Sequence, residues 1–118
     1  MATSQPFPLY ELIIQATCTY YNISREELFT KRADQSTIDK KQICFYIIKE
    51  MTGLRDTAMS RLLFHSRATI QHSVEKVAGE KDIYRQVISE INDIKALVYR
   101  LQEKQNAEWQ PRLSQVIS

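Results

Sequence analysis

Glycine is scarce in this sequence, which has only two glycines in 118 residues, Gly53 and Gly79. They stand far apart along the chain, so no glycine-rich loop of the Walker or dinucleotide-binding kind can be built to cradle phosphates. A nucleotide-driven motor is therefore not expected in this chain. The shortage of turn-forming residues also argues against a meander of β-hairpins.

Cysteine and histidine are equally rare, with two of each. Cys18 and Cys44 both stand within apolar helical patterns, which predicts free, buried thiols, although the sequence alone leaves a disulfide open. His65 and His72 have no cysteine nearby at the spacing of metal ligands, so neither a metal site nor a cofactor is expected. No nucleophile–base pair or carboxylate dyad stands at helical spacing, and an enzyme is not predicted.

Long apolar runs are also missing. No stretch of about 18 consecutive apolar residues occurs, so no membrane-spanning segment is predicted. The first fifteen residues contain neither Lys nor Arg, so the basic start of a secretory signal is lacking. We therefore expect a cytoplasmic protein whose length suits one domain around one core.

Positive charge is in small excess, with a net charge of only +2, but it is unevenly distributed. Residues 31–79 carry nine Lys or Arg against five Asp or Glu, whereas residues 1–30 are net acidic and residues 80–118 balance. This concentration in the middle of the chain is a modest electrostatic footprint of the kind that favours an anionic partner.

Apolar residues recur at spacings of three and four along most of the chain. This pattern predicts an all-α fold, a helical bundle of about five to six helices with a long C-terminal helix. A flexible leader over residues 1–8 precedes the first helix, which is expected to end near Asn22. Ser24 to Glu27 match the capping box that begins a helix, here a short one. We predict one domain over residues 9–106 and a frayed tail over residues 107–118.

The segment 30–36 is polar and shows no periodicity, which predicts a loop. The helical period returns at Thr37, and Gly53 is placed to end this central helix in the left-handed conformation. Three lysines are expected on the polar face of the helix: Lys40, Lys41 and Lys49.

Two short helical patterns follow, over residues 58–63 and about 67–78, with only residues 64–66 between them. Gly79 is expected to close the second. Two helices of about eight and eleven residues joined by a tight turn have the outline of a helix-turn-helix.

A long helix is predicted over residues 82–104. Its apolar spacings of four and three also suit a coiled-coil seam, so a protein partner or a homodimer through this helix stays open. The other interpretation is that the helix packs across its own domain, which we expect of its first half. The apolar stripe consists of Ile83, Val87, Ile91, Ile94, Val98 and Leu101.

The helix predicted over residues 67–78 is the candidate for reading DNA, because the second helix of a helix-turn-helix turns its first residues toward the base edges. Arg67 has the fork geometry to grip guanine, and Gln71 could pair with adenine. The alternative is the ordinary solvated face of an amphipathic helix. The candidate reading residues are Ser66, Arg67, Ala68, Thr69, Gln71 and His72.

The loop over residues 30–36 carries the basic pair Lys31 and Arg32. Basic loop residues beside a reading helix commonly contact phosphate or enter a minor groove, and Lys41 suits a phosphate contact as well. Plain surface charge is the competing interpretation for all three.

A series of motifs stands in order between Ile14 and Val77. The run YYNI at residues 20–23 is followed by ELF at 27–29, KR at 31–32 and KQI at 41–43, and the helix-turn-helix segment 59–72 then follows without gaps. Together they resemble the C-terminal domain of the bacterial replication initiator DnaA, a Trp-repressor-like helical fold that reads duplex DNA. The family signature has glycine, aspartate and histidine where this chain has Phe64, Ser66 and Arg67.

The resemblance implies binding of double-stranded DNA in replication or transcription control, without the ATPase module of the initiator. The candidate DNA-contacting positions, from the helix-turn-helix, the basic residues and the resemblance together, are Lys31, Arg32, Lys41, Gln42, Arg61, His65, Ser66, Arg67, Ala68, Thr69, Gln71 and His72.

The substituted signature and the small net charge also fit a second function, a protein-interaction module that keeps the fold but no longer reads DNA. The charge map separates the two: basic residues gathered on one face favour DNA, and scattered ones favour a protein partner. The basic residues concerned are Lys31, Arg32, Lys41, Arg61 and Arg67.

Overall fold

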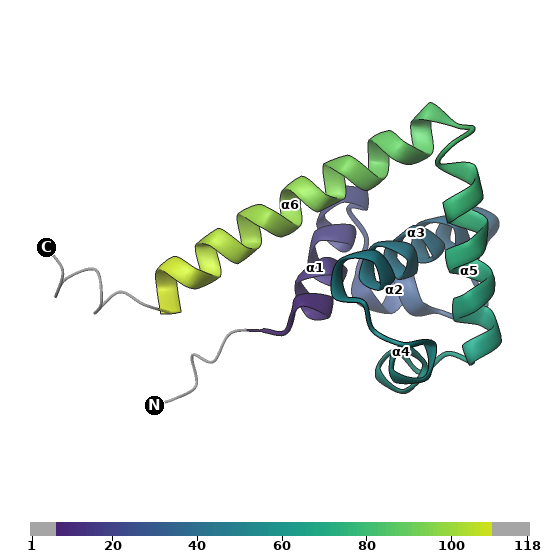
Figure 1. Ribbon diagram of the computed structural model, residues 1–118, viewed down its shortest axis with the longest axis horizontal. Helices are drawn as coiled ribbons and strands as arrows, with labels where there is room; N and C mark the ends of the chain where they lie inside the picture. The colour runs from purple at the N-terminus through teal and green to yellow at the C-terminus, as the bar shows by residue number, and fades with distance from the viewer. Residues whose placement is uncertain (1–6, 110–118) are drawn as a thin grey trace, which may run out of the picture.

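Six helices make up the described part of this computed structural model, residues 7–109, and no strand occurs there. The predicted all-α bundle with a long last helix is confirmed. Figure 1 shows α6 running along the upper side of the bundle and past α1, with α5 on the right, where α6 begins, and α4 at the bottom. The helices are α1 (Leu9–Tyr21), α2 (Arg25–Phe29), α3 (Gln35–Thr52), α4 (Asp56–Leu63), α5 (Arg67–Glu80) and α6 (Arg85–Trp109).

Helix α3 forms the centre of the core. Its residues 41–48 are all buried, because α1, α2, α5 and α6 each pack against it. A helix covered on every side is apolar on every side, which explains the uninterrupted run from Ile43 to Ile48. The largest fully buried side chains come from all six helices and include Ile13, Leu28, Phe45, Met59, Ile70 and Ile94.

Local sequence signals end or begin several helices as predicted. The Ser24 Oγ accepts the Glu27 N–H at 3.0 Å and the Glu27 side chain accepts the Ser24 N–H at 3.2 Å, which completes the capping box that starts α2. Asn22 ends α1 at φ 56°, and Gly53 ends α3 at φ 69°. Both conformations are left-handed, as helix termination by this motif requires.

Two predicted helix starts are wrong. Helix α3 begins at Gln35, before the expected Thr37, because the Asp34 side chain accepts the Thr37 N–H at 2.9 Å and caps the helix. Helix α6 begins at Arg85 instead of residue 82, and it runs to Trp109, beyond the predicted end at residue 104. Ile83 therefore lies in the turn before α6, where it is 72% exposed and takes no part in the apolar stripe.

Gly79 does not close α5. The helix continues through it to Glu80, and the Lys81 N–H still donates to the Val77 carbonyl at 2.9 Å. Glycine weakens a helix but does not force it to end. Gly79 therefore indicated roughly where α5 ends, but not the last residue of the helix.

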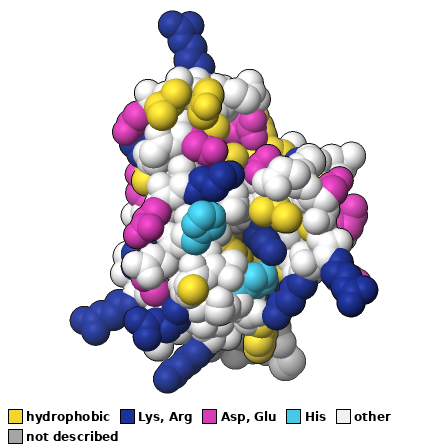
Figure 2. Space-filling model, turned by 90° about the vertical axis from the view of Figure 1, so that its right-hand side faces the viewer, with side chains coloured by type: hydrophobic (Ala, Val, Ile, Leu, Met, Phe, Trp, Pro, Cys, Tyr) yellow, Lys and Arg dark blue, Asp and Glu magenta, His cyan; other side chains and the backbone are white. Residues whose placement is uncertain are grey.

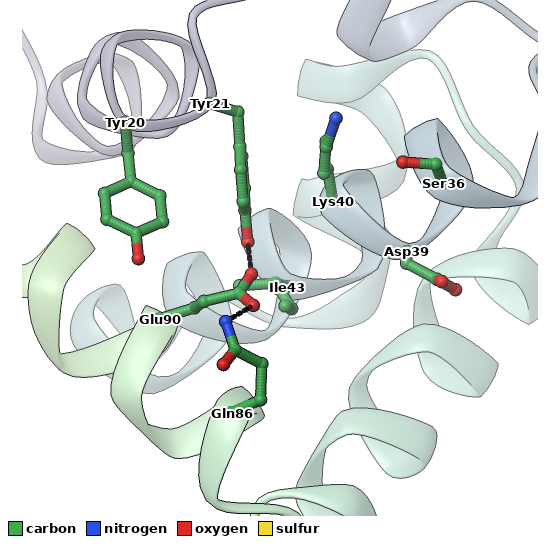
Figure 3. A pocket seen from close by; sticks show the side chains of 8 residues that line it. All are labelled: Tyr20, Tyr21, Ser36, Asp39, Lys40, Ile43, Gln86 and Glu90. Carbon is green, nitrogen blue, oxygen red and sulfur yellow. Dashed lines mark hydrogen bonds between the residues drawn. The ribbon is translucent and has the colours of Figure 1, made fainter.

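The long helix packs across its own domain. Ile91, Ile94 and Val98 are buried, and α1 is the main partner of α6. At the junction the Tyr21 hydroxyl donates to Glu90 at 2.5 Å, and this pair lies among the side chains drawn in Figure 3. The stripe that could have formed a coiled-coil seam is thus used inside the domain, and a homodimer through it is not supported.

The end of α6 also contacts the segment before α1. The Phe7 N–H donates to the Gln105 side chain at 2.8 Å, and Gln105 donates back to the Phe7 carbonyl at 3.3 Å. The predicted leader, residues 1–8, is therefore attached to the domain at Phe7, while residues 1–6 lie outside the described residues. Of the predicted tail, residues 107–109 continue α6, and residues 110–118 lie outside the described part.

Both cysteines are free thiols, as predicted, but only Cys44 is buried, whereas Cys18 is partly exposed. Cys44 is completely buried in α3, and this burial raises the pKa of its thiol to about 12. None of the helices in the described part of the chain is long and apolar enough to cross a membrane.

His65 fastens the turn between α4 and α5 to the core. Its ring lies 5.2 Å from the ring of Phe45 and 6.0 Å from that of Phe29, centroid to centroid. The Nδ1–H donates to the Leu63 carbonyl at 2.6 Å, since a carbonyl oxygen can only accept. Nε2 therefore keeps its lone pair and accepts from the Lys41 Nζ at 3.3 Å. Burial, and then the positive charges of Lys41 and Lys31, lower the pKa of His65, partly offset by the bond to Leu63.

We predict that Ile94→Ala destabilises the domain by about 2–5 kcal/mol, because it leaves a cavity between α6 and its partners. Ile83→Ala, which removes the same atoms from an exposed position, should change the free energy of unfolding by less than about 0.5 kcal/mol. Urea unfolding measures both. Equal, small effects would mean that α6 does not dock on the domain.

The lowered pKa of His65 predicts a dependence of stability on pH. Below pH 6.5, the ordinary histidine value, the unfolded chain binds a proton that the folded chain refuses, so stability should fall as the pH falls. Urea unfolding between about pH 7 and pH 5 should show this loss for the wild type and a flatter profile for His65→Gln. His72→Gln replaces the exposed histidine of α5 and should keep the wild-type profile. Identical profiles for wild type and His65→Gln would contradict the assignment.

Candidate nucleic-acid interface

Helices α4 and α5 form the predicted helix-turn-helix, joined by the three residues 64–66. The Ser66 Oγ accepts the Thr69 N–H at 3.1 Å and donates to the Thr69 Oγ1 at 2.8 Å, which fixes the first turn of α5. Ser60 on α4 donates its hydroxyl to the His65 carbonyl at 2.5 Å and so satisfies the backbone of the turn. The turn is therefore held from both helices.

One face of α5 is directed to solvent. Ile70, Ser73 and Val77 are buried, and α5 packs chiefly against α3. The helix begins at Arg67 as predicted and ends at Glu80, two residues beyond the predicted end. The sequence-predicted reading residues Ser66, Arg67, Ala68, Thr69, Gln71 and His72 are all exposed.

The basic loop lies beside the turn between α4 and α5. With α3 beginning at Gln35, the loop is reduced to residues 30–34, in which Lys31 and Arg32 are exposed. Lys31 lines the same surface hollow as Phe29, Phe64 and His65, so the loop meets the helix-turn-helix turn. The fold thus brings together two segments that stand far apart in the sequence.

Lys41 is not on a solvated face, as the sequence pattern had indicated. It is only 8% exposed, and its Nζ lies against the His65 ring beneath the basic loop. The periodicity missed this because α3 is covered on every side, including the side that carries Lys41. Burial, and then the nearby charge of Lys31, lower the pKa of Lys41. No carboxylate pairs with it within residues 7–109.

The other two lysines of α3 are also engaged. Lys49 donates to the Leu54 carbonyl at 2.9 Å and pairs with Asp56 at 3.2 Å, while the Lys40 Nζ lies 5.4 Å from the centre of the Tyr21 ring. Neither lysine therefore belongs to a free basic face.

Gln42 is buried and connects α3 to α5. Its side-chain oxygen accepts from the Lys76 Nζ at 3.0 Å, and Lys76 also approaches Asp39 and Glu80 at 3.5 Å each. The negative charge of Asp39 is thus offset by a lysine of α5. Gln42 holds α5 against α3, a role that its place in the sequence did not reveal.

The charge map is uneven on the face that α5 presents. Figure 2 shows most of the protruding Lys and Arg side chains on the lower half of this face, with others at its top and in its upper centre, and acidic side chains on its upper part and along its edges. The exposed cations Lys31, Arg32, Arg61 and Arg67 pair with no carboxylate among the residues that the structure describes. No group of metal-ligating side chains gathers in that part of the chain either.

Sequence reasoning missed the contact between Lys41 and His65, which stand 24 residues apart. Helical periodicity places each residue on its own helix and carries no signal for a pair formed between elements. It also missed the conformation of Phe64, for which the only hint was a phenylalanine at the place of the glycine in the resemblance.

Several curated proteins are similar to this chain, among them three named chromosomal replication initiator protein DnaA. The relative from Caldanaerobacter subterraneus subsp. tengcongensis is 25% identical over 85 residues, covering 72% of this chain and 19% of the relative. The relative from Xanthobacter autotrophicus is 30% identical over 87 residues, covering 72% and 17%. That from Thermoanaerobacter sp. is 27% identical over 70 residues, covering 59% and 16%. The chain thus spans less than a fifth of the length of these relatives.

The family described as "Bacterial dnaA protein helix-turn-helix" matches residues 10–77. This match covers more than half of the chain and includes α1 to α4 and most of α5, the elements that build the helix-turn-helix and the basic loop. The chain belongs to the bacterial DnaA helix-turn-helix family.

Proposed function

We propose that this protein binds double-stranded DNA through α5, in the control of replication or transcription. The observation that carries the proposal is the exposed first turn of α5, where Arg67 has no carboxylate partner among the described residues. The turn that leads into this helix lines the same surface hollow as Lys31 of the basic loop. Family membership supports it, since the family is a helix-turn-helix and the relatives are named as replication initiators.

In this proposal the first residues of α5 enter the major groove. The guanidinium of Arg67 donates two parallel hydrogen bonds to guanine O6 and N7, and Gln71, one turn later, pairs with adenine. Ala68 offers a methyl group to thymine, and His72 extends the same face. Ser66 keeps the helix start rigid, because its hydroxyl is committed to Thr69.

The loop residues Lys31 and Arg32 contact the phosphate backbone or the neighbouring minor groove, and Arg61 on α4 adds a further phosphate contact. Lys41 and His65 are buried beneath this surface and act on it through their charge and position. A lysine without a carboxylate partner, in a region of low dielectric, raises the positive potential of the surface above it. Exposed cations that form no ion pair among the described residues favour DNA over the alternative of a protein-interaction module.

We predict that duplex DNA of random sequence binds with a marked dependence on salt. About three to five phosphate contacts give a slope of roughly −3 to −4 in a plot of log affinity against log salt concentration. Fluorescence anisotropy at four salt concentrations measures it. Absent binding at low salt, or binding that ignores salt, would favour the protein-interaction module instead.

We predict that Arg67→Ala narrows the gap between specific and non-specific affinity. Loss of the guanine contact should cost about 1–3 kcal/mol on the preferred site and much less on random DNA, with the melting temperature nearly unchanged. Arg32→Ala is the matched control: it also removes one exposed arginine, but it should weaken all duplexes alike.

The measurement is selection from a random duplex library with each variant, followed by affinities at one fixed salt concentration. An unchanged selected motif for Arg67→Ala would mean that Arg67 contacts only the backbone. A changed motif for Arg32→Ala would make the loop arginine a base reader, contrary to its assignment.

A further inference from the structure

Phe64 has an unusual backbone conformation. It lies between α4 and α5 at φ 56° and ψ 42°, in the left-handed region that glycine adopts freely and other residues rarely do. Among the described residues Asn22 alone shares this property without being glycine, and asparagine is one of the residues best tolerated there. An aromatic residue at such a position is strained.

Core packing does not compensate for the strain. The Phe64 side chain is 80% exposed, more than any other large hydrophobic residue that the structure describes. A glycine would terminate α4 equally well and would expose no ring to water. Strained backbone that does not stabilise the fold occurs most often at residues whose side chains contact a ligand or partner.

The surroundings of the ring indicate the kind of partner. Phe64 lines a surface hollow together with Phe29, Leu62, Lys31 and His65, so an apolar floor is bordered by positive charge. Two residues further along the chain, Ser66 caps α5. The ring therefore projects at the start of the helix that reads DNA in the proposed function, on a surface that favours an anionic partner.

We propose that Phe64 is a DNA-contacting residue whose ring packs against the 5-methyl group of a thymine at the edge of the site read by α5. This inference rests on the proposed function. Thymine alone presents a methyl group in the major groove, and an apolar side chain is the natural partner for it. The left-handed backbone turns the ring outward, where it is available to the DNA.

The test compares Phe64→Gly with the wild type on the duplex that the wild type selects from a random library, at one fixed salt concentration. Each thymine is replaced in turn by deoxyuridine, which lacks only the methyl group. One position should weaken wild-type binding about fourfold, the value of one buried methyl group. Phe64→Gly should lose at least as much on the thymine duplex and be indifferent to deoxyuridine at that position.

Thermal unfolding of Phe64→Gly and two further variants, Phe64→Asn and Tyr99→Ala, separate an effect on binding from an effect on folding. Phe64→Gly relieves the backbone strain, so its thermal unfolding midpoint should not fall below that of the wild type. Phe64→Asn, a polar residue that tolerates the left-handed region, should lose the same affinity. Tyr99→Ala removes another exposed aromatic ring, 53% exposed on α6, and should leave DNA binding unchanged.

The possible outcomes distinguish failure of this inference from failure of the proposed function on which it rests. A wild type that binds no duplex overturns the proposed function and the inference together. A wild type that binds duplex while Phe64→Gly binds equally well overturns the inference alone. The inference also fails if the wild type tolerates deoxyuridine at every position, or selects no motif, since no thymine methyl is then read.

Discussion

The middle of α3, residues 41–48, is buried on every side, and four of the other five helices take their positions from it. Such a segment must be apolar all round or have its polar groups satisfied, because an unpaired polar group in a core costs stability. Its two polar members show how this condition is met. Gln42 accepts from Lys76 of α5, and Lys41 donates to His65 of the helix-turn-helix turn. The same two bonds that satisfy the core therefore hold the candidate reading helix and its turn in place.

This arrangement links the core to the electrostatics of the surface above it. Burial, with the positive charge of the exposed Lys31 adding to it, lowers the pKa of both Lys41 and His65, and no carboxylate among the described residues forms an ion pair with Lys41, His65 or Lys31. Placing cations together is unfavourable in the free protein and becomes favourable when an anionic polymer approaches. The strained and exposed Phe64 lies beside these cations. The repulsion between the cations and the strain at Phe64 both lower the stability of the free domain, and contacts made on binding can offset both.

Helix α6 lies beyond residues 10–77, the part that the family match covers. It packs chiefly on α1, away from α5, and its bonds to Tyr21 and Phe7 fasten both ends of the packed stretch. In the described structure it closes the core on the side opposite the candidate interface. Three residues of its apolar stripe, Ile91, Ile94 and Val98, are buried in this packing.

The sequence by itself determined what depends on neighbours along the chain. The helical period gave the fold class, the Ser24 capping box and the Gly53 terminus set their helix ends, and the start of α5 at Arg67 followed from the apolar spacing behind it. Each of these rests on bonds within about four residues. Only the tertiary structure decided the burial of Lys41, its contact with His65, the docking of α6 on α1 and the exposure of Phe64. These depend on which distant elements cover a given face, and a period of 3.6 residues says which face a residue occupies but not what lies against that face.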